Sequence, residues 1–168
     1  SLMVASGGGA ASPPKMAQLI KDKISHPYPG SGYGLTETNA SCCSGTGASF
    51  LDNPSSSGTL SPIIEFKTID ENGQDLPKGE RGEICIRGIL IANGYWNNPA
   101  ASAESFIDGW FSTGDIGYLD DENFVYVVDR AKDIIIRGGE NISANEVEAC
   151  YLEHPAVREA AAFSVAHD

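Results

Sequence analysis

Two short strings of the sequence place hydroxyl and carboxylate groups where they could bind a phosphate and a sugar. In residues 33–38, Thr36 is followed directly by Glu37. A threonine hydroxyl can donate to a phosphate oxygen, and a carboxylate is a hard oxygen ligand for Mg²⁺. Farther along, Asp115 follows Gly114, and an aspartate on a glycine turn can accept two hydrogen bonds from ribose hydroxyls. Each string taken alone is equally typical of a loop or turn that binds nothing.

A third string, residues 129–148, combines cationic side chains, a strand, a glycine loop and the start of a helix. Arg130 and Lys132 stand two apart, and three isoleucines at 134–136 predict a buried strand that breaks at the glycine pair 138–139. The pattern alone is that of a surface hairpin followed by an amphipathic helix.

Ser143 and Glu146 predict where that helix begins. They stand three apart, so the serine hydroxyl can accept a hydrogen bond from the third helical N–H while the glutamate reaches back to the chain. Pro155 ends the helical pattern.

The elements that must position these groups begin with a strand and a helix. Residues 2–5 predict a short buried strand that enters the glycine-rich segment 6–9, and apolar residues from 16 to 24 predict one face of a helix from about Pro14. Together they form half of a parallel α/β unit. Residues 39–58 predict a loop or linker, because they are rich in Ser, Gly, Ala and Asn and show little periodicity.

The middle of the chain predicts antiparallel strands. Residues 64–68 place Ile, Phe and Thr on one face and Glu and Lys on the other, and the Asn-Gly pair at 72–73 predicts a tight turn. Strands are also predicted at 82–88 and 124–128, which favours a small antiparallel sheet or distorted barrel. After the helix, residues 157–165 predict one further strand.

The composition excludes several classes of partner. With a net charge of −12 and only 11 basic residues, the chain lacks a face for nucleic acid or for an anionic membrane surface. No apolar run is long enough to span a bilayer and the first residues do not resemble a signal peptide, so a cytoplasmic location is expected.

The cysteines predict neither a metal site nor a disulfide framework. They stand at positions 42, 43, 85 and 150, which matches no Cys-x-x-Cys pair and no metal-ligand spacing. We expect free thiols in a reducing compartment. For the adjacent pair at 42–43, a strained redox bond is the alternative to two small, semi-buried residues.

Taken together, these strings resemble the adenylate-forming superfamily of acyl-CoA synthetases, aryl-CoA ligases, peptide-synthetase adenylation domains and luciferases. The resemblance rests on Tyr-Gly-Leu-Thr-Glu-Thr at 33–38, Thr-Gly-Asp at 113–115 and Asp-Arg-x-Lys-Asp at 129–133. Gly-Glu-Ile-x-Ile-Arg-Gly at 82–88 and Gly-Tyr-Trp-Asn-Asn-Pro at 94–99 add to it, with a mainly structural role. The match therefore covers nearly the whole sequence.

The resemblance implies a nucleotide site for ATP and AMP. Tyr33 would stack on the adenine, Thr36 would contact the α-phosphate, and Glu37 would bind Mg²⁺. Asp115, partnered by Arg130, would hold the ribose hydroxyls.

The resemblance also implies an acyl site, a hinge and a path for coenzyme A. The family has a glycine stretch similar to Gly8 and Gly9 whose backbone lines the acyl pocket and one side of the adenine. Lys132 would be the residue about which a small lid domain turns, bringing Gly138 and Gly139 toward the pantetheine of coenzyme A. The implied reaction joins a fatty or aryl carboxylic acid to AMP and then to coenzyme A.

In fold class, the resemblance implies an α+β chain in three parts. Residues 1–57 would be the end of an α/β large domain with the adenine and phosphate string, residues 58–131 a small, distorted antiparallel β-barrel with the ribose string, and residues 132–168 the start of an α+β C-terminal lid.

Two parts of the family pattern do not occur in the sequence. These are the Ser/Thr/Gly-rich phosphate loop ending in Pro-Lys-Gly, and a lysine near the end of the small domain. The loop grips the β- and γ-phosphates and the lysine offsets charge in the transition state. We therefore expect an internal fragment of a longer enzyme that is inactive alone.

Two other interpretations stay open at this point. The chain could be a non-catalytic nucleotide-binding or interaction module, or it could belong to a peptide-synthetase adenylation domain, although the strings at 94–99 and 138–142 are more similar to CoA ligases. A chain cut through a parallel sheet would also expose an unpaired edge, which predicts homo-oligomers formed through that edge or by lid exchange.

Overall fold

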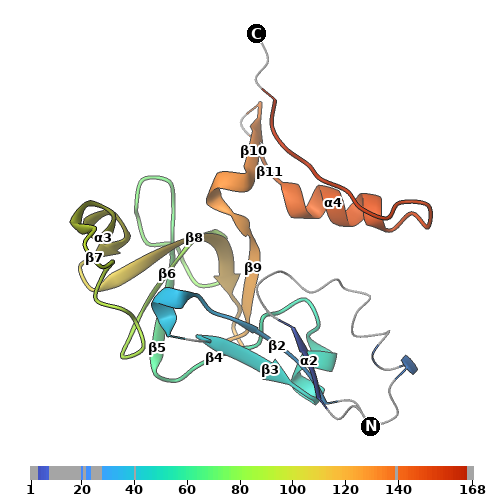
Figure 1. Cartoon of the computed structure of the whole chain (residues 1–168), viewed down its shortest axis with the longest axis horizontal. Helices are drawn as coiled ribbons and strands as arrows, with labels where there is room; N and C mark the ends of the chain where they lie inside the picture. The colour runs from blue at the N-terminus through green and yellow to red at the C-terminus, as the bar shows by residue number, and fades with distance from the viewer. Residues whose placement is uncertain are drawn as a thin grey trace.

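Two β-sheets and a C-terminal hairpin make up the computed structural model, which describes residues 4–7, 20, 22–23, 28–39, 41–138 and 140–165 (Figure 1). Among these residues, no helix is long and apolar enough to cross a membrane. The predicted mixture of helices and strands with a small antiparallel sheet is confirmed, and that sheet is curled.

The first sheet has the strand order β1-β2-β3-β4. Its strands are β1 (Val4–Gly7), β2 (Tyr28–Tyr33), β3 (Cys43–Thr46) and β4 (Thr59–Leu60). The β1–β2 pair is parallel and the other pairs are antiparallel. A strand near the N-terminus is thus present: β1 overlaps the predicted strand 2–5 at Val4 and Ala5 and continues to Gly7. Residues 2–3 and most of the predicted helix lie outside the described residues.

The second sheet is antiparallel and holds the ribose string. Its strands are β5 (Ile64–Ile69), β6 (Gly82–Gly88), β7 (Phe106–Ile107), β8 (Trp110–Leu119) and β9 (Val125–Arg130). The order is β5-β6-β8-β7, and β9 pairs with the second half of β8. The predicted strand at 82–88 is confirmed with its bounds, and the one at 124–128 is confirmed as β9, which begins one residue later and ends two residues later.

The core lies where the two sheets meet. Ile84 and Ile86 of β6 are fully buried, and Phe111 of β8 is 1% exposed. Cys42, next to β3, and Ile64 of β5 pack in the same cluster. The alternation predicted for β5 is confirmed, because one set of its side chains faces this cluster while the other faces solvent.

The prediction of a loop over residues 39–58 is wrong, because this segment contains β3 and the helix α2 (Ala48–Asp52). The strand is hidden in the sequence because its residues are small. A side chain at Gly58 would meet the backbone of Ser44 at 2.0 Å, and one at Gly45 would lie 3.1 Å from the Gly58 Cα. Residue 58 therefore crosses β3 so closely that glycine replaces the bulky residues typical of a strand.

A hairpin and a helix follow β9 and stand apart from the two sheets (Figure 1). They are β10 (Ile134–Arg137), β11 (Glu140–Ser143) and α4 (Ala144–Leu152). The isoleucine strand is half-buried rather than buried as predicted, with Ile136 74% exposed. Exposure increases along β10, from the half-buried Ile134 and Ile135 to the exposed Ile136 and Arg137, because a two-stranded hairpin has no second layer that could cover it along its whole length.

The predicted strand over residues 157–165 is not formed. The segment is irregular, and Phe163 and Val165 are 75% and 76% exposed. Strand-like composition is insufficient here because no described strand pairs with this segment. Its backbone instead donates from Ala162 N to Glu148 Oε1 of α4 at 2.9 Å.

The core makes a direct prediction. Replacing Ile86 by alanine removes a fully buried side chain and should lower the free energy of unfolding by about 2–5 kcal/mol. The matched control is Ile89→Ala, because Ile89 is 83% exposed and its loss should change stability by no more than about 0.5 kcal/mol. Urea unfolding measures both, and equal effects would contradict the described core.

Candidate functional site

An open cleft of about 1260 Å³ lies where the two sheets meet the start of the hairpin. It is lined by the end of β2 with the 3₁₀ helix η1 (Thr36–Thr38), by the middle of β8, and by the junction from β9 through the 3₁₀ helix η2 (Ala131–Asp133) to β10. The predicted site residues that line this cleft are Tyr33, Thr36, Glu37, Asp115, Arg130 and Lys132.

Of the four glycines among the predicted site residues, Gly138 falls within the described part of the chain. Gly138, with a φ of +62°, forms the turn between β10 and β11 and does not line the cleft. Gly8, Gly9 and Gly139 lie outside the described residues.

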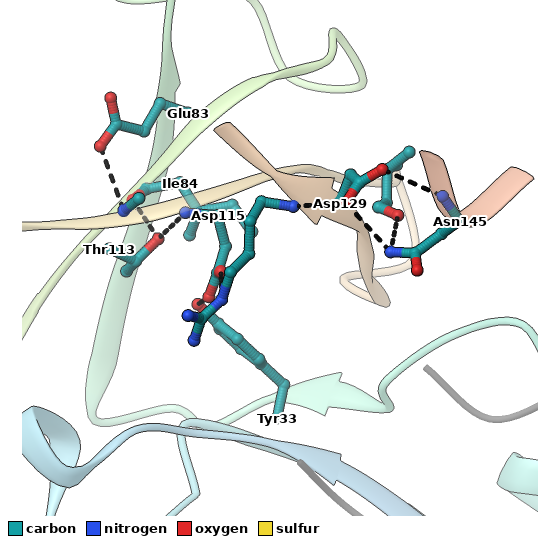
Figure 2. Close-up of polar contacts among 10 residues, drawn as sticks. Tyr33, Glu83, Ile84, Thr113, Asp115, Asp129 and Asn145 are labelled. Carbon is teal, nitrogen blue, oxygen red and sulfur yellow. Dashed lines mark hydrogen bonds and ion pairs between the residues drawn. The ribbon is translucent and has the colours of Figure 1, made fainter. Parts of the chain in front are cut away.

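Asp115 is a buried carboxylate in the cleft wall, with 5% of the residue exposed. Tyr33 Oη donates to Asp115 Oδ2 at 2.7 Å, and Arg130 Nε lies 3.4 Å from Asp115 Oδ1. Figure 2 shows the Tyr33 ring pointing toward Asp115 from the neighbouring sheet. The β8–β9 register places Arg130 opposite Asp115. Side chains from β2 and β9 therefore both reach the Asp115 carboxylate on β8.

The groups around Asp115 leave its carboxylate able to accept further hydrogen bonds. Burial raises the pKa of Tyr33 and the adjacent Asp115 adds to the shift, so the phenol stays a proton donor. The Arg130 side chain is 57% exposed, so its ion pair with Asp115 contributes little stability. The role of Arg130 is instead to orient the Asp115 carboxylate. An ionised carboxylate has about four acceptor positions, so Asp115 can accept hydroxyl hydrogens from the cleft as well.

Asp115 stands in a bulge of β8 rather than on the predicted glycine turn. The β6–β8 register pairs Cys85 with Ser112 and Glu83 with Ile116, which leaves three residues of β8 opposite one of β6. Gly114 has a φ of +71° at the centre of this bulge. The bulge turns the Asp115 side chain to the cleft, and bulges often re-aim side chains beside functional sites.

Hydrogen bonds from β6 hold the bulge in shape. Glu83 Oε1 accepts from Gly114 N at 3.2 Å and also from Ser112 Oγ. Thr113 Oγ1 donates to Ile84 O at 2.9 Å and accepts from Asp115 N at 3.1 Å (Figure 2). Sequence reasoning missed Glu83; the register shift that gives it this role is a property of the paired strands.

Thr36 and Glu37 lie together on η1 at another wall of the cleft. Thr36 is exposed, and Glu37 Oε1 accepts a hydrogen bond from Tyr95 Oη at 2.8 Å. Among the described residues, no three His, Cys, Asp or Glu side chains gather into a metal site. A single carboxylate still fits Mg²⁺, which usually keeps several waters and takes its other ligands from substrate phosphates. The hydrogen bond to Glu37 raises the pKa of Tyr95.

Asp129 ties the chain before Lys132 to the chain after it. It is 4% exposed and accepts from Ser143 Oγ at 2.7 Å, from Asn145 Nδ2 at 3.1 Å and from Arg130 N at 2.8 Å (Figure 2). Lys132 itself is exposed in η2, between β9 and β10. Sequence reasoning used Asp129 only as part of a string and missed these contacts.

The predicted helix cap at Ser143 is formed in one of its two halves. Glu146 N donates to Ser143 Oγ at 3.2 Å. The Glu146 carboxylate does not reach back as predicted, since its Oε1 lies 3.5 Å from Nη1 of Arg81, the residue just before β6. That ion pair is an additional link between α4 and the sheet.

The cysteines are free thiols. Cys42 and Cys43 are buried and unbridged, and Cys42 Sγ lies 3.2 Å from Tyr33 O. Contact with the Cys43 thiol and burial raise the pKa of Cys42, so this thiol stays protonated and packs as part of the core.

The sequence matches a known family and known enzymes. Residues 1–96 match the family model described as AMP-binding enzyme. The 2-succinylbenzoate–CoA ligase of Bacillus licheniformis is 46% identical over 128 residues, which are 76% of this chain and 27% of that enzyme. The long-chain-fatty-acid–CoA ligase of Escherichia coli O6:H1 is 36% identical over 171 residues, which are 98% of this chain and 29% of that enzyme.

The fold matches solved structures of similar enzymes. The o-succinylbenzoate CoA synthetase of Bacillus subtilis, in complex with the acyl-adenylate intermediate OSB-AMP, superposes with a TM-score of 0.88 at 36% identity. The match covers 98% of this chain and 34% of that one. The same enzyme in complex with ATP and magnesium gives a TM-score of 0.82 at 37% identity, covering 93% and 32%. The chain thus spans 27% to 34% of the length of these relatives.

The bulge predicts how residue 114 responds to substitution. A Cβ at Gly114 would meet no atom within 4 Å, so the cost of Gly114→Ala comes from its positive φ alone and should be about 1–2 kcal/mol of unfolding free energy. Gly114→Asn should cost less, because asparagine tolerates this conformation.

Gly73→Ala is the matched control, since Gly73 has a φ of +76° and equally open surroundings outside the cleft. Urea unfolding should give it a cost similar to that of Gly114→Ala. Only Gly114→Ala should shift the amide resonance of Asp115. A Gly114→Ala chain as stable as the wild type would contradict the left-handed bulge.

Proposed function

Since the chain belongs to the family of AMP-binding enzymes, we propose that it is part of an ATP-dependent acyl-CoA or aryl-CoA synthetase. The single observation that carries this proposal is the convergence of Tyr33, Arg130 and the buried Asp115 in the cleft that also holds Thr36 and Glu37. Ligases for both 2-succinylbenzoate and long-chain fatty acids resemble it, so the substrate class is a carboxylic acid.

Asp115 holds the ribose of the nucleotide in this proposal. Its carboxylate is pre-oriented by Tyr33 and Arg130 and keeps acceptor positions for ribose hydroxyls. Because the carboxylate is already buried and fixed, little side-chain entropy is lost when the sugar binds. The Tyr33 ring lines the same cleft and provides an apolar face for the adenine.

Thr36 and Glu37 hold the phosphate end. The Thr36 hydroxyl donates to an oxygen of the α-phosphate, and Glu37 would hold Mg²⁺, which neutralises charge on the phosphates when bound. Both residues lie on one short 3₁₀ helix, so the phosphate and metal contacts are set by the same rigid turn.

The proposed reaction has two steps. An oxygen of the substrate carboxylate attacks the α-phosphorus of ATP, the bond to the bridging oxygen breaks, and acyl-AMP and pyrophosphate result. The thiol of coenzyme A, losing its proton, then attacks the acyl carbon and AMP leaves. This assigns ATP, Mg²⁺ and coenzyme A to the whole enzyme.

The division of the chain follows the same proposal. Residues 1–57 are the end of the large domain, 58–131 the barrel and 132–168 the start of the lid. Lys132 is the hinge, which its position in the exposed turn η2 supports. A turn of the lid there moves the β10–β11 glycines relative to the cleft, as closure about a few hinge residues requires.

The nucleotide site is tested by calorimetric titration of the purified chain with AMP. We expect saturable binding that Asp115→Ala and Asp115→Asn weaken roughly tenfold or more, because a hydrogen bond to a charged group is worth about 1.5–3 kcal/mol. Asp121→Ala is the control, since Asp121 is exposed and does not line the cleft. Unaltered affinity in both Asp115 variants would remove Asp115 from the site.

Catalysis is tested separately, by measuring acyl-AMP and pyrophosphate from ATP, Mg²⁺ and a panel of aryl and fatty acids. Acyl-AMP made by this chain would assign the first step to it. Saturable AMP binding without acyl-AMP would restrict the chain to nucleotide binding, which is the non-catalytic alternative.

A further inference from the structure

Tyr95 reaches across the fold to the carboxylate of Glu37. The two residues are 58 positions apart, and Tyr95 Oη donates to Glu37 Oε1 at 2.8 Å. Both side chains line the cleft. The hydrogen bond uses one oxygen of the carboxylate and leaves the other oxygen for a further ligand.

The ring of Tyr95 is anchored to the core. It meets Phe106 edge-on, with ring centroids 5.6 Å apart and planes at 72°. Phe106 stacks in turn on Phe111 at 4.8 Å, and Phe111 is 1% exposed. The phenol is therefore positioned by packing rather than by the hydrogen bond alone, which distinguishes it from a freely rotating surface tyrosine.

The backbone around Tyr95 is fastened to the same 3₁₀ helix. Ala92 N donates to Glu37 O at 2.7 Å, and Asn39 Nδ2 donates to Leu90 O at 2.8 Å. One backbone–backbone bond and one bond from the Asn39 side chain, beside the Tyr95–Glu37 bond, make the segment around 90–95 a support for the turn that carries Glu37.

The approach to Tyr95 requires glycine at position 94. Gly94 has a φ of +143°, and a Cβ there would lie 3.0 Å from Ser102 Oγ. Ser102 Oγ accepts from Tyr95 N at 2.8 Å, which fixes the backbone of Tyr95 against α3 (Pro99–Ser105). The string at 94–99 thus presents one phenol to the cleft.

We propose that Tyr95 is a positioning residue that holds the Glu37 carboxylate with one oxygen turned to the cleft, where a magnesium ion bound to nucleotide phosphates would meet it. This rests on the proposed function. Holding the carboxylate in one orientation removes the rotamer entropy that a free glutamate loses on binding a ligand. The hydroxyl acts on the metal only through Glu37 and touches neither the acid nor the nucleotide.

Calorimetric titration of the 168-residue chain with AMP free of metal, and with ATP plus Mg²⁺, tests the proposal. Tyr95→Phe should weaken the Mg²⁺-dependent affinity for ATP about three- to tenfold, the loss expected for one hydrogen bond. It should leave AMP affinity and the urea midpoint unchanged. Tyr118→Phe is the control, because that ring stacks on Tyr126 at 4.7 Å and does not line the cleft.

A second measurement places the effect at the carboxylate. In a chain that already carries Glu37→Gln, adding Tyr95→Phe should produce no further loss of Mg²⁺-dependent ATP affinity, because the two residues act as one unit. Equal further loss in that background would overturn the proposal. ATP affinity that is unchanged or tighter in Tyr95→Phe, or an equal loss for AMP, would also overturn it.

The outcomes separate this inference from the function on which it rests. A folded wild-type chain that binds ATP without any Mg²⁺ dependence has no metal site at Glu37, which removes the proposed metal role of Glu37 together with the role of Tyr95 and leaves the ribose site at Asp115 to the AMP titration. A wild-type chain with Mg²⁺-dependent binding that Tyr95→Phe does not alter keeps the proposed function and loses only the role of Tyr95.

Discussion

The irregular pairing of β6 with β8 is the constraint on which the cleft depends. Three residues of β8 stand opposite one residue of β6, and Gly114 takes up the strain with a φ of +71°. Without that bulge, regular alternation would fix the direction of Asp115 by strand period alone. Glu83 accepts a hydrogen bond from the Gly114 amide, which leaves the ladder, and this bond fixes the shape of the bulge.

The same strand pair supports both halves of the cleft. On one side Thr113 links the bulge to Ile84, a fully buried core residue. On the other side Phe111 carries the ring contacts that continue through Phe106 to Tyr95 and end at Glu37. Polar groups facing the cleft are therefore fixed by a close-packed core that deforms little, which suits a site that must hold a ligand in one geometry.

The hairpin and α4 are held to the sheets mainly by polar contacts. Asp129 accepts from Ser143 and Asn145 across the turn that contains Lys132, and Glu146 faces Arg81. The proposed movement of α4 about Lys132 would break these contacts and expose their groups to water, which can satisfy them in turn. Replacing such polar contacts by contacts with water costs less free energy than separating a buried apolar interface. The junction can therefore hold α4 in one arrangement and still allow a second arrangement.

The sequence by itself determined two of the strands and several of the residues that line the cleft. Ile64 to Thr68 alternate in character, residues 82–88 form an apolar run bounded by glycines, and the strings at 33–38, 113–115 and 129–133 place particular residue types at fixed spacing. Only the tertiary structure decided that β3 is a strand, because its residues are small where Gly58 passes close to its backbone, and small residues have low strand propensity. It also decided that Asp115 stands in a bulge, that Tyr95 supports Glu37, and that residues 157–165 remain irregular. Local sequence patterns indicate which side chains of a segment are buried and which face water. A register shift, or a contact between residues 58 positions apart, exists only once the strands are paired.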